Sequence, residues 1–237
     1  MRVRPKPLLE ESIDSETVRS AVRVIFSPCG CWRAAVAARL ARTAGPRRGR
    51  RELTKHWIAI ERALSSIGCS HALTLNPGAT TPTIEKLESH TEIQLPESAR
   101  DMLLGHDGQA SGPGLIYGYR YLSVTEIVAN WDNWRSIDEP AMNDDCAESM
   151  SSSPQGYIKP LYTNRRWIPL AHDGGGNHIG LDFDPDVNGS PGQVIRFGRD
   201  EDEKTLLASN YGDFLDRLAR DLGQARWNGK YLEWPSN

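Results

Sequence analysis

The sequence predicts an α+β fold in which a mostly antiparallel sheet is flanked by N-terminal helices and by one amphipathic helix near the C-terminus. Three observations favour this class. Apolar residues recur at helical spacing after residue 53, they form short strand-like runs between residues 167 and 208, and they return to helical spacing near the end. Because the segments that join the short runs are too short for crossover helices, the strands are expected to pair antiparallel.

Three helices are expected ahead of the sheet. Apolar residues at helical spacing over residues 57–64 mark the first helix. The second begins at Thr81, a capping residue type that is followed by Pro82 in the first turn. The third begins at Pro96 and ends near Gly108, since glycine readily adopts the left-handed conformation that terminates a helix.

The middle of the chain is expected to add one strand and one helix. Leucine and tyrosines alternate with other residues over 114–122, which is the period of a strand. Ser123 and Glu126 have the spacing of a capping box, so a helix that carries Trp131 and Trp134 should begin there. The acidic and serine-rich residues 138–156 are expected to form a long exposed loop.

Four short strands and a final helix are expected after this loop. The strands cover residues 167–171, 178–183, 193–197 and 206–208. Pro169 has no backbone N–H, so the first strand should lie at an edge of the sheet or contain a bulge. Asn210 is expected to cap the last helix, whose apolar residues form the clearest helical stripe of the chain.

Charge divides the chain near residue 53. Residues 1–55 hold 13 Lys and Arg against 5 Asp and Glu, a net charge of +8, whereas the remaining residues hold 15 against 26, a net charge of −11. Residues 1–52 are therefore expected to be a basic, poorly ordered extension, and residues 53–237 to form the domain. A net negative domain disfavours nucleic acid as a partner. No apolar run reaches the roughly 18 residues of a membrane span, so a cytoplasmic protein is expected.

Neither a metal nor a cofactor is expected from the motifs. The glycine-rich residues 172–177 lack the lysine of a phosphate-binding loop, and a tight turn between strands explains the glycines. Residues 184–189 match the first half of a calcium loop, but Ile195 stands where the closing glutamate belongs. Cys29 and Cys31 are spaced too closely for a zinc site and have no second pair of ligands.

Two alternatives stay open at this point. His172, Asp173 and Asp182 could form an acid–base site with a serine or cysteine, because catalytic groups converge in space and not in sequence. The tryptophans are candidates either for contacts with a partner or for the core. The three that stand out are Trp131, Trp134 and Trp167.

The segment 167–177 and its surroundings resemble the SUKH superfamily, and the resemblance covers residues 57 to about 222. It implies the α+β fold described above. Its signature residues, expected to be mainly structural, are Trp167, Pro169, Gly174, Gly175, Gly176, Asn177, Asp182, Gly189, Gly192 and Gln193. His178 and Gly180 depart from the bulkier residues expected at their positions, so the strand that carries them should be bent.

The resemblance implies a protein-binding module and not an enzyme. The superfamily includes bacterial immunity proteins and the fungal cell-wall-assembly regulator of the Smi/Knr type. The acidic domain favours an immunity protein that neutralises a basic, nuclease-type toxin, with neither nucleic acid nor membrane as a partner. The alternatives are a ligand-binding or hydrolytic protein that uses the turn at 172–177, and a regulatory scaffold of cell wall assembly. The expected partner-binding residues are Asp144, Asp145, Glu148, His172, Asp173, Asp200, Glu201, Asp202 and Glu203.

Overall fold

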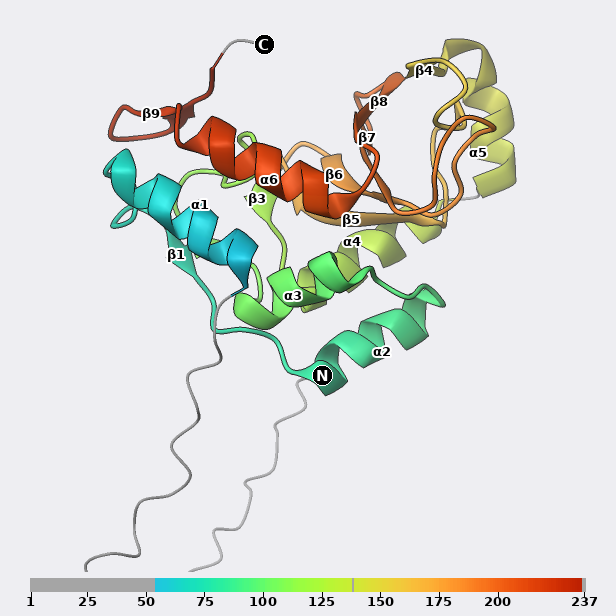
Figure 1. The fold of residues 1–237 in the computed structure, drawn as a ribbon. Coiled ribbons are helices and arrows are strands. Elements are labelled where there is room, and N and C mark those ends of the chain that lie inside the picture. The colour runs from blue at the N-terminus through green and yellow to red at the C-terminus, as the bar shows by residue number, and fades with distance from the viewer. Residues whose placement is uncertain (1–53, 138, 236–237) are drawn as a thin grey trace, which may run out of the picture. The chain divides into compact units, whose positions relative to one another are not determined.

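The computed structural model describes residues 54–137 and 139–235, so the prediction for residues 1–52 lies outside the described part of the chain (Figure 1). The helices are α1 (Lys55–Ser66), α2 (Thr81–Thr91), α3 (Glu97–Gly105), α4 (Val124–Arg135), α5 (Glu139–Cys146), the 3-10 helix η1 (Ala147–Ser149) and α6 (Tyr211–Leu222). The strands are β1 (Thr74–Leu75), β2 (Gln109–Ser111), β3 (Arg120–Tyr121), β4 (Ser151–Ser153), β5 (Trp167–His172), β6 (Asn177–Asp182), β7 (Gln193–Gly198), β8 (Glu203–Ala208), β9 (Arg226–Trp227) and β10 (Leu232–Glu233).

The main sheet has six strands in the order β3-β5-β6-β7-β8-β4. Its neighbouring strands pair antiparallel, except that β4 runs parallel to β8. Two small antiparallel sheets, β1-β2 and β9-β10, complete the described strands. The predicted α+β class is confirmed, and the parallel pair makes the main sheet mixed.

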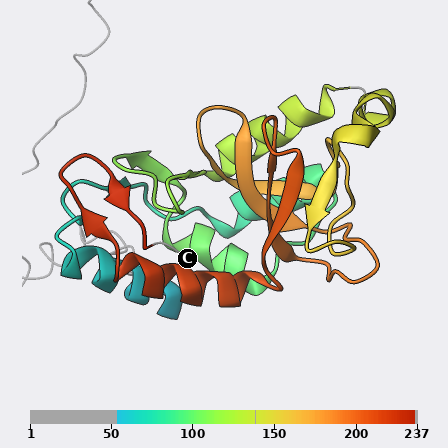
Figure 2. The same ribbon diagram turned by 90° about the horizontal axis from the view of Figure 1, so that it is seen from above.

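Helices lie on both sides of the main sheet. Figure 1 shows α6 crossing in front of it with α1 alongside, and Figure 2 shows α4 on the other side. The face toward α6 is apolar: Ile168, Ile179 and Leu181 are buried and belong to one cluster with Phe214 of α6. Removing such apolar area from water contributes roughly 25 cal/mol per Å², so burial of this face stabilises the fold.

The helix starts follow their local signals, with one shift. The capping box at Ser123 opens α4, and the Asn210 side chain accepts a hydrogen bond from the first turn of α6. Helix α2 is capped by Thr80 and not by the predicted Thr81. Pro82 still lies in the first turn of that helix, where its missing N–H leaves no intrahelical bond unmade.

Two predictions for the middle of the chain were wrong. Residues 138–156 contain α5, η1 and β4 instead of a long loop, because β4 gains its backbone hydrogen bonds from the distant strand β8, which polar composition cannot reveal. The strand predicted at 114–122 is reduced to β3. Tyr117 and Gly118 have positive φ values of 49° and 90°, so the chain reverses there and Ile116 pairs with Tyr119.

The prediction of a bulge at Pro169 is confirmed. Strand β5 lies inside the sheet, but β3 pairs only with its last residues, Ala171 and His172. The register between β5 and β6 shifts between Pro169 and Ala171. Gly180 faces this irregularity, and a Cβ atom there would lie 2.1 Å from the Ile168 carbonyl oxygen. A larger residue is therefore excluded by the close approach of the two strands.

Candidate functional site

A buried carboxylate ties the signature residues together. Asp182 Oδ1 accepts hydrogen bonds from Trp167 Nε1 at 3.1 Å and from the Asp184 backbone N–H at 2.8 Å. Its Oδ2 accepts one from Gln193 Nε2 at 2.9 Å, and the same Gln193 group donates to the Tyr157 carbonyl at 2.8 Å. Burial raises the pKa of Asp182, and these donors oppose the rise. The network thus joins three strands to the loop before β5. Gly189 and Gly192 lie in the loop that follows β6.

One aspartate closes the turn between β5 and β6. Asp173 Oδ1 accepts from the backbone N–H groups of Gly175, Gly176 and Asn177 at 2.6, 3.1 and 3.0 Å. Its Oδ2 accepts from the Asn177 side-chain amide at 2.8 Å. Gly174 and Gly176 have positive φ values of 88° and 112°, which only glycine adopts freely. Burial works against the charge of Asp173, but the hydrogen bonds from Asn177 and Gly175 outweigh it and lower the pKa. Both carboxylate oxygens are therefore used within the turn.

The three residues of the hydrolytic alternative do not meet. His172 and Asp173 lie at the turn end of the β5-β6 hairpin, where His172 pairs with His178. Asp182 pairs with Trp167 at the other end. At about 3.3 Å per residue, the four residues from His178 to Asp182 place the two ends roughly 13 Å apart. No acid–base site joins these three side chains.

A pocket of about 340 Å³ opens where α4 faces the β5-β6 turn. Trp134 of α4 and Tyr162 form its walls, with ring centroids 5.7 Å apart. His172 and His178 lie at its base, with ring centroids 4.7 Å apart. Its other lining residues are Asn130, Asn133, Ile137, Gly176 and Arg199. The volume lies within the roughly 300–1,000 Å³ that is typical of ligand sites.

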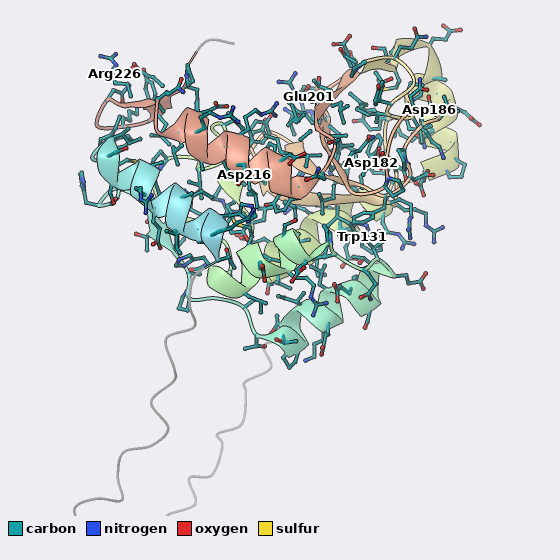
Figure 3. The ribbon with its side chains drawn as sticks, in the orientation of Figure 1. Trp131, Asp182, Asp186, Glu201, Asp216 and Arg226 are labelled. Carbon is teal, nitrogen blue, oxygen red and sulfur yellow. The ribbon has the colours of Figure 1, made fainter. Side chains whose placement is uncertain are left out.

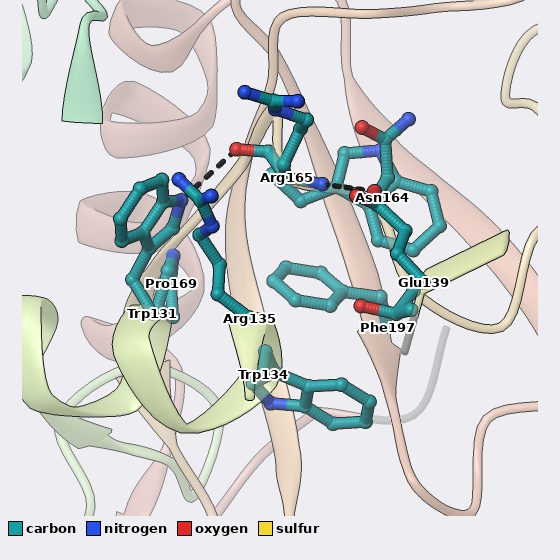
Figure 4. Close-up of a pocket in the computed structure, with 10 residues that line it drawn as sticks. Trp131, Trp134, Arg135, Glu139, Asn164, Arg165, Pro169 and Phe197 are labelled. Atoms are coloured by element: carbon teal, nitrogen blue, oxygen red, sulfur yellow. Dashed lines mark hydrogen bonds between the residues drawn. The ribbon is translucent and has the colours of Figure 1, made fainter. Parts of the chain in front are cut away.

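A narrow crevice of about 10 Å³ is shown in Figure 4, and Trp134 lines both this crevice and the pocket. Trp167 and Phe197 lie at its base with ring centroids 5.2 Å apart, and Phe197 stacks on His178 at 5.5 Å. The base is therefore one continuous face of β5, β6 and β7. The other lining residues are Trp131, Arg135, Glu139, Thr163, Asn164, Arg165 and Pro169. We call the pocket and the crevice together the α4 groove.

His178 is neutral at physiological pH, and its neighbours set its tautomer. The Asn130 side-chain N–H donates to the Glu126 carbonyl at 2.8 Å, which leaves Asn130 Oδ1 facing His178 Nε2 at 3.1 Å. An amide oxygen only accepts, so Nε2 carries the proton and Nδ1 is an acceptor. Burial, with a smaller contribution from His172, lowers the pKa of His178 to about 3. Nδ1 has no hydrogen-bond partner among the described residues.

The charge of the α4 groove is opposite to that of the domain. Arg135, Arg165 and Arg199 line it, against the single carboxylate of Glu139. Glu139 is partly engaged, because its Oε1 accepts from the Arg165 backbone N–H at 2.8 Å. The Arg135 guanidinium lies 4.6 Å from the centroid of the Trp131 ring. The groove thus carries an excess of positive charge on a domain whose residues 56–237 have a net charge of −11.

The parallel pairing of β4 with β8 brings the two predicted acidic segments together. The Ser151 N–H donates to the Asp202 carbonyl at 3.0 Å, so the residues before β4 lie beside those before β8. Most of these carboxylates are exposed: Asp144, Asp145, Glu148, Asp200, Asp202 and Glu203. Glu201 is less exposed, and its Oε2 lies 3.0 Å from Arg196 Nε (Figure 3). None of the carboxylates of this acidic surface lines the α4 groove, although Asp200 and Asp202 act electrostatically on Tyr162, which does.

A buried lysine lies next to these carboxylates. Lys204 is 0% exposed, and its Nζ donates to the Glu201 carbonyl and lies 3.4 Å from Met150 Sδ. Burial lowers its pKa to about 8, although Asp202 and Glu201 act in the opposite direction. Composition did not reveal this residue, because a lysine between acidic neighbours ordinarily remains in solvent.

The sequence named several groove residues but did not join them into one site. His172 was expected to contact a partner, and Trp131, Trp134 and Trp167 were left between core and interface. Trp131 and Trp167 are buried and Trp134 is half-buried. Other lining residues, such as Asn130, Tyr162 and Arg199, come from segments with no common motif. The one available signal was the pair of tryptophans three positions apart on a helix, since such residues share a face.

The signature network, the turn and the whole α4 groove fall within one matched region. Residues 78–217, more than half of the chain, match the SMI1/KNR4 family (SUKH-1). The chain belongs to this family. The resemblance drawn from residues 167–177 is confirmed, and the SMI1/KNR4 region contains each signature residue.

Curated SMI1/KNR4 relatives are fungal. The chain is 35% identical over 161 residues to the cell wall biosynthesis/cell cycle regulator smi1 of Schizosaccharomyces pombe, which covers 63% of this chain and 32% of the relative. It is 31% identical over 186 residues to the glucan synthesis regulatory protein of Neurospora crassa, covering 65% and 35%. It is 30% identical over 187 residues to the cell wall assembly regulator SMI1 of Saccharomyces cerevisiae, covering 65% and 37%. The chain thus spans about a third of the length of these relatives.

The expected role as a bacterial immunity protein against a nuclease-type toxin is wrong. The SMI1/KNR4 relatives above are fungal proteins named as regulators, and none of these names refers to a toxin. The error came from the net charge, which describes the whole surface and does not identify a partner. The expectations of a cytoplasmic location and of no membrane partner stay predictions. Within the described residues, no helix has both the length and the apolar character needed to cross a bilayer.

Proposed function

We propose that this chain is a non-catalytic protein-binding module that takes part in regulating cell wall assembly. The observation that carries the proposal is its similarity to three fungal proteins named as regulators of cell wall biosynthesis, glucan synthesis or cell wall assembly. The similarity extends over the same domain that contains the signature and the α4 groove. The proposal replaces the toxin-directed role with the regulatory scaffold.

The described geometry supports binding in preference to chemistry. Asp182 of the signature and Asp173, which was expected to contact a partner, both accept hydrogen bonds from within the fold, so they serve as structural anchors. The α4 groove instead presents aromatic rings and arginines, and these residue types are enriched in protein interfaces. A partner protein is therefore the class of ligand that suits the groove.

A graft tests the regulatory role. The matching segment of the Saccharomyces cerevisiae relative is replaced by this chain, and growth on a cell-wall-damaging dye and glucan content are measured. We expect the graft to restore both readouts to a strain that lacks the relative, whereas the relative with the segment deleted does not. A graft that accumulates normally and still behaves like the deletion would contradict the proposal.

A separate assay tests the absence of catalysis. The purified chain is incubated with ester, phosphodiester and glycoside reporter substrates, and no turnover is expected. Turnover that disappears on replacing His172 or Asp173 by alanine, while the circular dichroism spectrum is retained, would overturn the non-catalytic assignment.

A further inference from the structure

The α4 groove has the features of a docking site for a particular kind of segment. Resting on the proposed function, we infer that it binds a segment of a partner protein that carries a tyrosine or tryptophan beside an anionic group. The aromatic ring occupies the pocket beside the Trp134–Tyr162 pair, and the anionic group contacts the exposed arginines that line the groove.

The shape of the pocket selects an aromatic anchor. Trp134 and Tyr162 are tilted by 56° to one another, and Trp134 meets the His178 ring edge-on at 6.2 Å. Because these rings already touch one another, a ligand ring packs beside them in the pocket, where it gains the edge-to-face and offset contacts that aromatic side chains prefer. Trp134 is only half-buried, so part of its ring remains available for such a contact.

The polar atoms of the pocket favour a partner ring that carries a hydrogen-bond donor. His178 is 1% exposed, lines the pocket and has an acceptor, Nδ1, without a donor among the described residues. Leaving a buried acceptor unpaired costs free energy, which a ligand donor recovers once it displaces the atoms that cover Nδ1. A tyrosine hydroxyl or an indole N–H supplies this donor, whereas phenylalanine does not. The His172 Nδ1 atom already accepts from the Gly174 N–H at 3.3 Å, so His178 holds the free acceptor.

The rim selects an anionic neighbour. The Arg199 side chain is 70% exposed, and its closest carboxylate, Asp200, lies at 3.6 Å and is itself 60% exposed. Such a solvated pair is weak and leaves the guanidinium able to bind another anion. Arg135 and Arg165 extend the positive charge along the crevice. Carboxylate and phosphate groups each present a pair of oxygens that the planar arginine guanidinium can bind with two parallel hydrogen bonds. A nucleic acid is disfavoured, because its continuous backbone charge would meet the net −11 of residues 56–237.

A peptide-display library of random sequences, selected on the full chain, tests the inference. We expect the enriched peptides to contain tyrosine or tryptophan within a few residues of aspartate or glutamate. Trp134→Ala and Arg199→Glu should each weaken the binding of an enriched peptide by about tenfold or more, as expected for an anchor and a charge contact. The matched control is Arg226→Glu, because Arg226 is 77% exposed and lies well away from Trp131 (Figure 3).

The outcomes separate this inference from the proposed function. Enrichment of basic or purely aliphatic peptides, no enrichment, or equal binding to the Trp134→Ala and Arg226→Glu proteins would overturn the groove assignment. So would tight binding of a uridine homopolymer that competes with the peptide. Trp134→Phe is the conservative variant, because it keeps an aromatic ring at this position. The thermal melting curve of each variant shows whether the protein is folded. If the wild-type graft restores growth and glucan content and the Trp134→Ala graft restores them equally well, the groove inference alone is contradicted. If the wild-type graft restores neither, the proposed function is contradicted.

Synthetic versions of one enriched peptide identify the anionic group. One version keeps the carboxylate, one replaces it with phosphoserine and one with asparagine or serine. Tighter binding of either anionic version than of the neutral one supports the arginine contact and shows which anion is preferred. Equal binding of all three versions would remove the anionic group from the inference.

Discussion

The two faces of the main sheet are built on different principles. The face toward α6 is formed by residues such as Ile168, Ile179 and Leu181, which pack with Phe214 in one apolar cluster. The face toward α4 alternates with it along the same strands and carries Trp167, His178, Asp182 and Gln193, which are also buried. One face thus gains its free energy from apolar contact, while the other buries polar groups and must satisfy them.

The difference teaches where stability and recognition lie in this domain. Apolar contacts do not require particular partner atoms, because their free energy depends on the apolar area that is buried. Buried polar groups require particular partners, and this requirement fixes the positions of rings and loops around the α4 groove. On this face, His178 Nδ1 has no hydrogen-bond donor among the described residues, and His178 lines the α4 groove. The apolar face stabilises the domain, and the polar face positions the residues that line the α4 groove.

The largest expected effect is on the apolar face. Phe214→Ala should lower the free energy of unfolding by about 3–5 kcal/mol, because it leaves a cavity under α6. Val187→Ala, at a position 88% exposed, should change it by less than about 0.5 kcal/mol. Urea denaturation followed by circular dichroism measures both. A loss below about 1 kcal/mol for Phe214→Ala would mean that this face does not dominate stability.

A smaller loss is expected on the polar face. Asp182→Asn keeps one acceptor for Trp167 but places an N–H group against the Gln193 Nε2 donor. The free energy of unfolding should fall by about 1–3 kcal/mol, the cost of a buried donor without an acceptor. Asp145→Asn, at an exposed carboxylate, serves as the control and should have no measurable effect in the same denaturation experiment. Equal curves for the two variants would show that the network is dispensable.

The polar face should also make stability depend on pH. The pKa of His178 is lowered to about 3 in the folded protein, so between that value and roughly 6.5 the unfolded chain binds the additional proton. Stability should therefore fall as the pH falls from 7 to 5, by at most about 1.4 kcal/mol per pH unit from this residue.

The variant His178→Phe isolates that dependence. The pKa of His56 is also lowered by burial, but His56 acts in both proteins, so the difference between them reports His178. The variant should lose stability at pH 7, because Asn130 Oδ1 loses its donor, and should approach the wild type at pH 5. Parallel stability curves between pH 5 and 7 would contradict the prediction.

The smallest effect is expected outside both faces. Asp144→Lys combined with Asp145→Lys alters two exposed carboxylates of α5, and the free energy of unfolding should change by less than about 0.5 kcal/mol. Growth on the cell-wall-damaging dye and glucan content in the graft should also stay unchanged, because these residues do not line the α4 groove. A loss of either readout at unchanged stability would restore the acidic surface as the site of partner contact.

Much of the fold could be predicted because its signals are local. Helices α1, α3, α4 and α6 lie where apolar spacing and capping residues placed them. The bulge followed from the missing N–H of Pro169. The failures were non-local: β4 exists because β8 offers it hydrogen bonds, and the alternation over 114–122 was interrupted by the positive φ values of Tyr117 and Gly118.

By itself, the sequence determined the fold class, the strands of the central hairpin, the start of α6 and the family to which the chain belongs. These depend on periodicity, capping and one contiguous signature, which are properties of neighbouring residues. Only the tertiary structure decided that Asp173 and Asp182 serve the fold, that the acidic segments meet, and that Trp134, Tyr162, His178 and Arg199 surround one pocket. The physical reason is that hydrogen bonds, pockets and local charge arise from contacts between distant segments, whereas composition reports only their sum.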